Sequence, residues 1–233
     1  MSEISNIVIQ YTCEENNATY SLFDIVKPHI NGAYAFPHLN LTLTVPAEYK
    51  VSFNDDLLSY GFSSTKIQII VKRYGKAEYK KIITNQGTVP TEADFTIRCD
   101  EEYAEAEAIF CCKGIDQQKI IINTRQEHTA PRTKSNLIIK AVLDNYAQIK
   151  SNTMIFVEKG AHQVDASQTS KNIMLSSTAH AIAVPKLEVL ADDVLCKHGA
   201  AISMIDSEAL FYLQSRGLSE QGSKKMIIDS FLQ

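Results

Sequence analysis

Two short runs, Ile67-Gln-Ile-Ile-Val71 and Lys119-Ile-Ile-Ile122, decide the fold class of this chain. Both are rich in β-branched residues, which favour extended strands. Both are nearly continuous in their apolar character, a pattern that suits parallel strands better than strict alternation of apolar and polar residues does. The two runs therefore predict β-strands and favour a parallel arrangement.

Segments of the same kind recur from about residue 40 to residue 195, separated by polar turn sequences such as Lys113–Gln118. No long helical period interrupts the series. The predicted strands are Leu41–Val45, Lys66–Arg73, Asp94–Cys99, Ala108–Cys112, Lys119–Thr124, Asn136–Leu143, Thr153–Val157, Asn172–Ser176 and Leu187–Ala191. The chain is therefore predicted to be all-β. Sandwiches, barrels and β-helices would all give this pattern of short strands.

Charge and composition exclude several classes of protein. The net charge is −4 and no dense Lys/Arg block occurs, which argues against nucleic acid as a partner. No run of about 18 apolar residues occurs, so we expect no membrane span. The first residues do not resemble a secretory signal, so we expect a cytoplasmic protein.

The five cysteines are odd in number, and none form a Cys-x-x-Cys pair. In a cytoplasmic protein this pattern indicates reduced thiols rather than a disulfide framework. Cys111 and Cys112 are neighbours in a predicted strand, so we expect one to be buried packing and the other to point outward.

The chain lacks the motifs of common enzymes. It has no G-x-x-x-x-G-K-[ST] phosphate loop, so we expect that no nucleotide is bound by this chain. It has no G-x-S-x-G nucleophile elbow either. A β-helical carbohydrate-active enzyme would need carboxylates or arginines on one outer sheet. The adjacent pair Asp192-Asp193 is better interpreted as a turn, and we predict that this protein is not an enzyme.

The stretch Ala191-Asp-Asp-Val-Leu-Cys196-Lys-His198-Gly-Ala200 contains the best candidates for metal ligands. If it is a strand, Cys196 and His198 point to one face and Lys197 to the other. Thiolate is a soft ligand suited to iron–sulfur chemistry, and imidazole also binds iron. From the spacing alone, a small buried cysteine beside a hydrogen-bonded histidine is the alternative.

Two helices are predicted after this strand. Asp206 is a good N-cap for the first and Gly217 is well placed just beyond its end. Ser219 caps a second helix with an apolar stripe at Ile227, Ile228, Phe231 and Leu232. We expect this tail to cover the open end of the β-body, to dock a partner, or both.

The Cys-x-His-Gly-Ala stretch and the later Phe211-Tyr-Leu-Gln-Ser-Arg216-Gly-Leu218 closely resemble the C-terminal part of the SufB/SufD family of iron–sulfur cluster assembly scaffolds. Weaker similarity extends through Gly160–Ser176, with departures at Val164 and Ser170, and through His128–Ser135. The specific resemblance covers about the last half of the chain. It implies an all-β core, a right-handed parallel β-helix, with a small C-terminal α-helical segment.

The resemblance also implies a function. Gly199 and Ala200 suit the SufD-like branch, so we expect a SufD-like scaffold subunit that works with a SufB-like subunit, or as a homodimer, and with a SufC-like ABC ATPase. An iron–sulfur cluster or iron would bind transiently at Cys196 and His198 at the subunit interface. The partner-binding candidates in the tail are Phe211, Tyr212, Arg216, Ile227 and Phe231. A structural β-solenoid that binds proteins without a metal is the alternative.

The expected organisation has three parts: a short N-terminal segment at 1–40, a β-helix core at 41–205, and an ATPase-docking helical segment at 206–233. Family members usually carry a substantial helical segment before the β-helix. Here strand-like sequence begins within roughly forty residues of Met1, so the chain resembles a shortened member of the family.

Overall fold

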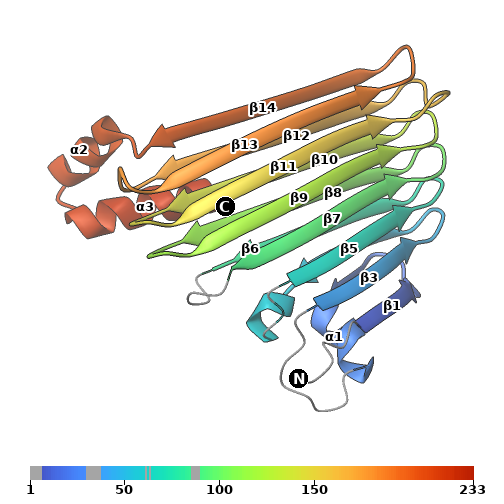
Figure 1. The fold of residues 1–233 in the computed structure, drawn as a ribbon, viewed down its shortest axis with the longest axis horizontal. Helices are drawn as coiled ribbons and strands as arrows, with labels where there is room; N and C mark the ends of the chain where they lie inside the picture. The colour runs from blue at the N-terminus through green and yellow to red at the C-terminus, as the bar shows by residue number, and fades with distance from the viewer. Residues whose placement is uncertain (1–6, 30–37, 61, 63, 85–89) are drawn as a thin grey trace.

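The computed structural model describes residues 7–29, 38–60, 62, 64–84 and 90–233. In this part of the chain the strands form two parallel sheets of seven strands each. The odd-numbered strands make sheet A and the even-numbered strands make sheet B, so each coil contributes one strand to each sheet (Figure 1). The predicted parallel β-helix is confirmed.

The strands of sheet A are β1 (Ile7–Thr12), β3 (His38–Val45), β5 (Ser64–Val71), β7 (Thr91–Cys99), β9 (Lys119–His128), β11 (Gln148–Val157) and β13 (His180–Val189). Those of sheet B are β2 (Ala18–Ser21), β4 (Lys50–Asp55), β6 (Lys76–Ile83), β8 (Glu105–Gly114), β10 (Lys134–Leu143), β12 (Asp165–Met174) and β14 (Leu195–Met204). Short helices α1 (Leu22–Val26), η1 (Lys27–His29) and η2 (Leu57–Tyr60) lie near the N-terminal end.

Inward and outward residues alternate along every central strand. In β9 the side chains of Ile120, Ile122 and Thr124 are buried, whereas Ile121 between them is only half-buried. The near-continuous apolar runs therefore do not mean that both faces of the sheets are covered. The inner faces of the two sheets pack against each other to form the core.

The centre of the core is aromatic. The ring of Phe95 stacks on that of Tyr79 at 4.2 Å, and Phe110 meets Phe95 edge-on at 5.4 Å. Beside this cluster a buried ion pair joins Lys81 Nζ to Asp55 Oδ2 at 2.6 Å. The hydroxyl of Tyr79 donates to the same carboxylate oxygen at 2.5 Å.

Strand β14 corresponds to the candidate strand around Cys196 and His198, and four other strands were not predicted: β1, β2, β4 and β6. The first two fall in the segment 1–40 that was expected to precede the core, and β1 pairs with β3 in parallel. Strand β6 reads Lys-Ala-Glu-Tyr-Lys-Lys-Ile-Ile, with three lysines in eight residues. Its charged residues obscure the alternation of inward and outward positions. One of the inward positions is itself occupied by a lysine, Lys81.

Two C-terminal helices, α2 (Ser207–Ser215) and α3 (Glu220–Leu232), follow β14. Asp206 Oδ1 caps α2 by accepting from the backbone N–H of Glu208 at 2.9 Å, and Gly217 beyond its end has φ +92°. Ser219 Oγ accepts from the Gly222 N–H at 3.1 Å and caps α3. The predicted caps are confirmed.

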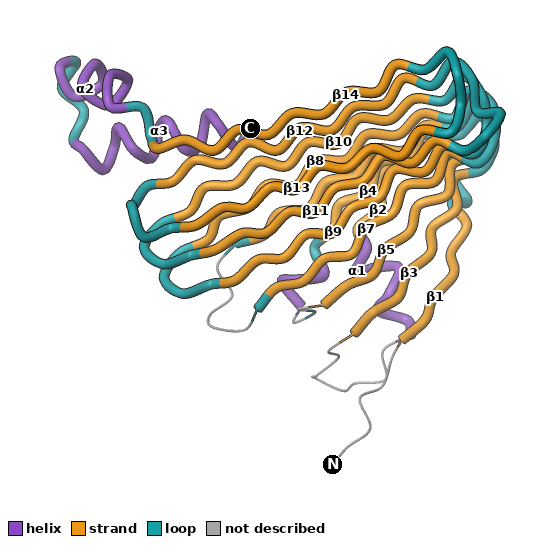
Figure 2. Tube along the Cα trace, turned by 45° about the horizontal axis from the view of Figure 1, so that its top comes forward, coloured by secondary structure: helices purple, strands orange, loops and turns teal. Residues whose placement is uncertain are grey.

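Helix α3 packs against the outer face of sheet B and leaves the end of the β-helix open (Figure 2). The expectation that the tail covers this end is therefore wrong, because the apolar side of α3 is used on the side of the sheet. Cys112 faces the core as expected for one member of the pair. Cys111 faces outward, yet it is also buried, because α3 covers it and the carbonyl oxygen of Leu232 lies 3.2 Å from its Sγ. No helix among the described residues is long and apolar enough to cross a membrane.

Candidate functional site at the open end

Cys196 and His198 lie on β14, the last strand of sheet B. Their register partners on β12 are Ala166 and Gln168, which are both buried in the core. Because side chains at the same register of a parallel ladder point to the same face, Cys196 and His198 both face the inside of the terminal coil. Cys196 is half-buried and His198 is exposed, since no further coil among the described residues covers them.

The open end around this pair is apolar. In sheet B the inward residues Ile202 and Met204 are 45% and 48% exposed. In sheet A the inward residues Leu187 and Val189 are 40% and 38% exposed. Strands β13 and β14 are also edge strands, each with a single paired neighbour. An apolar surface between two free strand edges is a typical site of protein association.

The chemistry of the pair is that of an incomplete ligand set. Burial raises the pKa of the Cys196 thiol, and the nearby Asp165 carboxylate raises it further. A metal would therefore have to displace a proton from Cys196 on binding. No group of three or more His, Cys, Asp or Glu side chains suited to a metal occurs among the described residues. This part of the chain thus presents two candidate ligands and lacks a full coordination shell.

Several other positions in the stretches that resemble the SufB/SufD family are buried in the interior and serve the structure. Ser135 Oγ accepts from Gln126 Nε2 at 2.6 Å and contacts His128 Nε2 at 2.8 Å. Thr133 Oγ1 contacts His128 Nδ1 at 2.7 Å and donates to the Ala130 carbonyl oxygen. The proton of the Thr133 hydroxyl is thus engaged, so Nδ1 must donate and Nε2 must accept.

This network holds the imidazole in its neutral form. His128 is fully buried, and burial lowers its pKa to about 4. Two further buried residues, Gln168 and Asn172, donate to carbonyl oxygens of the next coil, those of Lys186 and Ala201. These contacts support the interpretation of the polar residues in the family-resembling stretches as links between coils.

The partner-binding candidates in the tail divide into two groups. On α2, Phe211 and Tyr212 are 74% and 56% exposed, and the guanidinium of Arg216 lies 5.3 Å from the Tyr212 ring centroid. On α3, Ile227 and Phe231 are only half-buried, so part of each remains available. None of the residues of α2 is buried. Packing within this chain therefore does not account for the two aromatic side chains on this helix.

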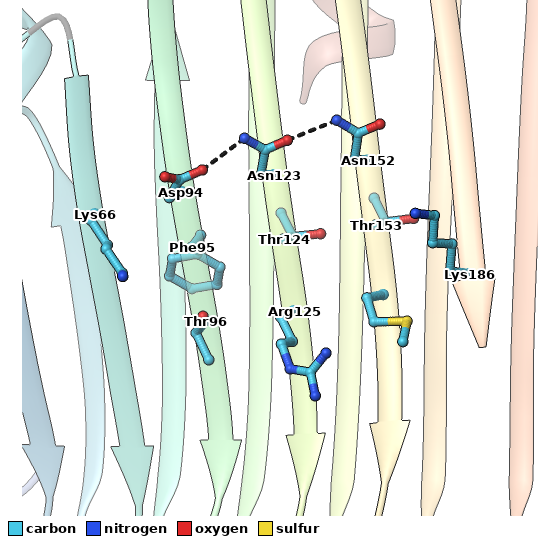
Figure 3. A pocket seen from close by; sticks show the side chains of 11 residues that line it. Lys66, Asp94, Phe95, Thr96, Asn123, Thr124, Arg125, Asn152, Thr153 and Lys186 are labelled. Carbon is cyan, nitrogen blue, oxygen red and sulfur yellow. Dashed lines mark hydrogen bonds between the residues drawn. The ribbon is translucent and has the colours of Figure 1, made fainter. Parts of the chain in front are cut away.

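A groove on the outer face of sheet A was not predicted. A ladder of short polar side chains forms its floor: Asn123 Nδ2 donates to Asp94 at 2.7 Å, and Asn152 Nδ2 donates to Asn123 at 2.8 Å (Figure 3). The cavity measures about 430 Å³, with Lys66 and Lys186 among its lining residues. The equal spacing of 29 residues between successive ladder positions is a signal in the sequence that could have revealed it.

This groove does not have the composition of a glycosidase site. Among the described residues that line it, Asp94 is the single carboxylate, and it is already bonded to Asn123. Glycoside hydrolysis in most families requires a pair of carboxyl groups across the bond to be cleaved. The turn interpretation of Asp192 and Asp193 also holds, because both lie in the bend between β13 and β14.

Comparison with known proteins agrees with the fold and the motifs. The family model described as "SUF system FeS cluster assembly, SufBD core domain" matches residues 42–231. An iron-sulfur cluster assembly SufBD family protein of Synechocystis is 29% identical over 67% of this chain and 34% of its own length. The iron-sulfur cluster assembly protein SufD of Escherichia coli is 35% identical over 45% of this chain and 25% of its own length.

The corresponding SufD protein of Bacillus subtilis is 27% identical over 69% of this chain and 36% of its own length. The chain therefore spans roughly a quarter to a third of the curated relatives described here. The family match extends upstream of the motifs that first suggested it, through most of the β-helix. With its parallel β-helix and its SufD-named relatives, this chain belongs to the SufB/SufD family of iron–sulfur cluster assembly proteins and is SufD-like.

Proposed function

We propose that this chain is a SufD-like scaffold subunit of an iron–sulfur cluster assembly complex. The observation that carries the proposal is the position of Cys196 and His198 on an apolar open end bounded by two free strand edges. A second β-helix that met this end would bury the apolar rim and place its own side chains opposite the pair. The partner would be a SufB-like subunit or a second copy of this chain.

The cluster or the iron is the cargo of this site. A thiolate and an imidazole are suitable ligands for an iron–sulfur species, and two ligands require completion by the partner. Because the pKa of Cys196 is raised, binding of metal releases a proton and should strengthen as the pH rises. The site assignment therefore predicts metal binding that depends on both pH and the partner.

The tail is proposed to dock a SufC-like ABC ATPase. Exposed aromatic residues and arginine are enriched at protein interfaces, and α2 presents Phe211, Tyr212 and Arg216 together. The chain has no phosphate loop of its own, so ATP hydrolysis would belong to that partner and this subunit would not be an enzyme.

The first experiment tests the ligand pair. The chain is co-expressed with SufB-like and SufC-like subunits, and the purified complex is reconstituted with iron and sulfide under anaerobic conditions. We expect Cys196→Ser and His198→Ala to reduce cluster absorbance while the complex remains assembled. The matched control is His180→Ala, which removes an exposed histidine from the outward side of the same terminal coil.

Equal cluster yield in all variants would refute the site and would favour the alternative, a structural β-solenoid that binds proteins without metal. Loss of the complex itself would instead indicate that the pair serves association. Size-exclusion chromatography of each reconstituted sample separates these two results.

A second experiment tests the tail. We expect deletion of residues 206–233, or the double substitution Phe211→Ala/Tyr212→Ala, to abolish ATPase capture in a pull-down. The thermal unfolding of the double variant should stay close to that of the parent, because α2 buries no residue. Met226→Ala, at a 50% exposed position of α3, is the matched control. Retained capture by the double variant would remove α2 from the docking surface.

A further inference from the structure

The groove on the outer face of sheet A is long and narrow. Its lining residues come from five consecutive strands, β5, β7, β9, β11 and β13 (Figure 3). Neighbouring strands of a sheet are about 4.8 Å apart, so the groove extends roughly 19 Å across the strands. A volume of about 430 Å³ spread over that length has space for one extended chain rather than for a compact ligand. The last lining strand, β13, is an edge strand, so one end of the groove reaches the open end of the β-helix.

The two lysines that line the groove lie at its opposite ends. Lys66 is on β5 and Lys186 is on β13. Lys66 is the register partner of Asp94, but its side chain extends along its own strand, away from the polar ladder (Figure 3). Neither lysine amine forms an ion pair with a carboxylate of the described residues. Unpaired positive charge is therefore present at both ends of the groove.

A third cation, Arg125, lies between the two ends. Its Nε donates to Glu127 Oε1 at 2.6 Å, and its guanidinium lies 4.7 Å from the centroid of the Phe156 ring. The lining carboxylate, Asp94, accepts from Asn123 at 2.7 Å. Three cations thus face two carboxylates, and the lysines at the ends are the unpaired ones. Because an excess of positive charge in a groove attracts negative groups, the groove favours an anionic ligand.

The floor of the groove offers amide groups. Asn152 Nδ2 donates to Asn123 Oδ1 at 2.8 Å, and Asn123 Nδ2 donates to Asp94. Each of these amide nitrogens carries two hydrogens, so the ladder leaves one N–H of each asparagine unused. Asn152 Oδ1, at the end of the ladder, is an unused acceptor. A peptide backbone has both donors and acceptors and can pair with both kinds of group, whereas a phosphate polymer can only accept.

We propose that the groove binds an extended acidic segment of another polypeptide, about six residues long, with a carboxylate near each end. An extended chain rises about 3.3 Å per residue, so six residues span the groove. The two carboxylates would meet Lys66 and Lys186, and the backbone between them would pair with Asn123 and Asn152. This inference goes beyond the assembly of a cluster and stands whether or not the open end binds one.

The first test is fluorescence polarisation with the intact chain at low salt. The probe is a fluorescein-labelled hexapeptide with blocked ends, with aspartate at its first and last positions and serine and glycine between. Lys66→Gln and Lys186→Gln should each weaken binding roughly two- to five-fold, and a probe with asparagine at both ends should bind roughly ten-fold more weakly. Lys171→Gln, an exposed substitution on the outer face of sheet B, removes the same charge and should leave the affinity unchanged. Equal binding of the two probes, or equal weakening by Lys171→Gln, would overturn the proposal.

The second test separates a peptide from a simple polyanion. Asn152→Ala removes the free amide at the end of the ladder and keeps every charge of the groove. It should weaken binding of the acidic probe roughly two- to ten-fold and leave the competition by tripolyphosphate unchanged. Tripolyphosphate that binds more tightly than the probe, together with no effect of Asn152→Ala on the probe, would overturn the proposal in favour of a charged surface without peptide recognition.

Discussion

Acidification should destabilise this protein through His128. The ring is fully buried, and its pKa in the folded state is lowered to about 4 by burial. In the unfolded chain the ring titrates near its usual value of about 6.5. The folded state thus binds fewer protons than the unfolded state between these values. The contribution of neutral His128 is complete above about pH 6.5 and is lost as the pH falls to about 4.

The size of the effect follows from the two pKa values. At 1.36 kcal/mol for each pH unit, the loss amounts to roughly 3 kcal/mol of unfolding free energy. The hydrogen bonds act in the same direction, because Nε2 accepts from Ser135 and a proton there would oppose this contact. Carboxylates also titrate in this range, so the histidine must be isolated by a substitution.

The assay is urea unfolding of the parent chain and of His128→Gln at several values between about pH 7 and about pH 4.5. We expect the variant to be less stable at neutral pH and to have a shallower pH dependence, so that the two curves converge on acidification. His180→Gln, an exposed substitution, should keep the slope of the parent. Parallel curves for the parent and His128→Gln would refute the reasoning.

Three further substitutions test the fold. Lys81→Met leaves the Asp55 carboxylate buried without its cation and should cost about 3–5 kcal/mol in urea unfolding, part of which Asp55→Leu in the same chain should restore. Phe110→Ala opens a cavity in the aromatic centre and should cost about 3–5 kcal/mol, whereas a loss below about 1 kcal/mol would contradict the packing described. Gly217→Ala forces a side chain into the left-handed region at φ +92°, at roughly 1–2 kcal/mol, and should be seen as faster amide exchange in α2 rather than as global unfolding.

The strands that could be predicted are those whose inward positions are apolar. In Lys119–Thr124 and Asn136–Leu143 the inward residues are isoleucine, leucine and alanine apart from Thr124, and the strands were found near their observed places. Strand β6 was missed because its inward column contains Lys81, whose charge is satisfied by Asp55 from the preceding coil. A partner from another coil cannot be identified from local composition.

The candidate ligands and the caps of the tail could also be predicted from the sequence. Cys196 and His198 share a face for the simple reason that side chains in a strand alternate, and Asp206 and Ser219 cap helices through local hydrogen bonds. Only the tertiary structure shows that the face shared by Cys196 and His198 is the inner face of sheet B. The two side chains point inward and yet are accessible, because β14 is the last strand of its sheet and no helix in the described part of the chain covers it.

The same holds for the interior and for Cys111. Gln168 and Asn172 lie in a stretch that resembles the SufB/SufD family, but their burial depends on the register of coils about thirty residues apart. Cys111 points outward as alternation requires, and it is buried only because α3 folds back onto sheet B. Periodicity along a strand is a local property of the chain, whereas burial depends on which distant segments cover that strand.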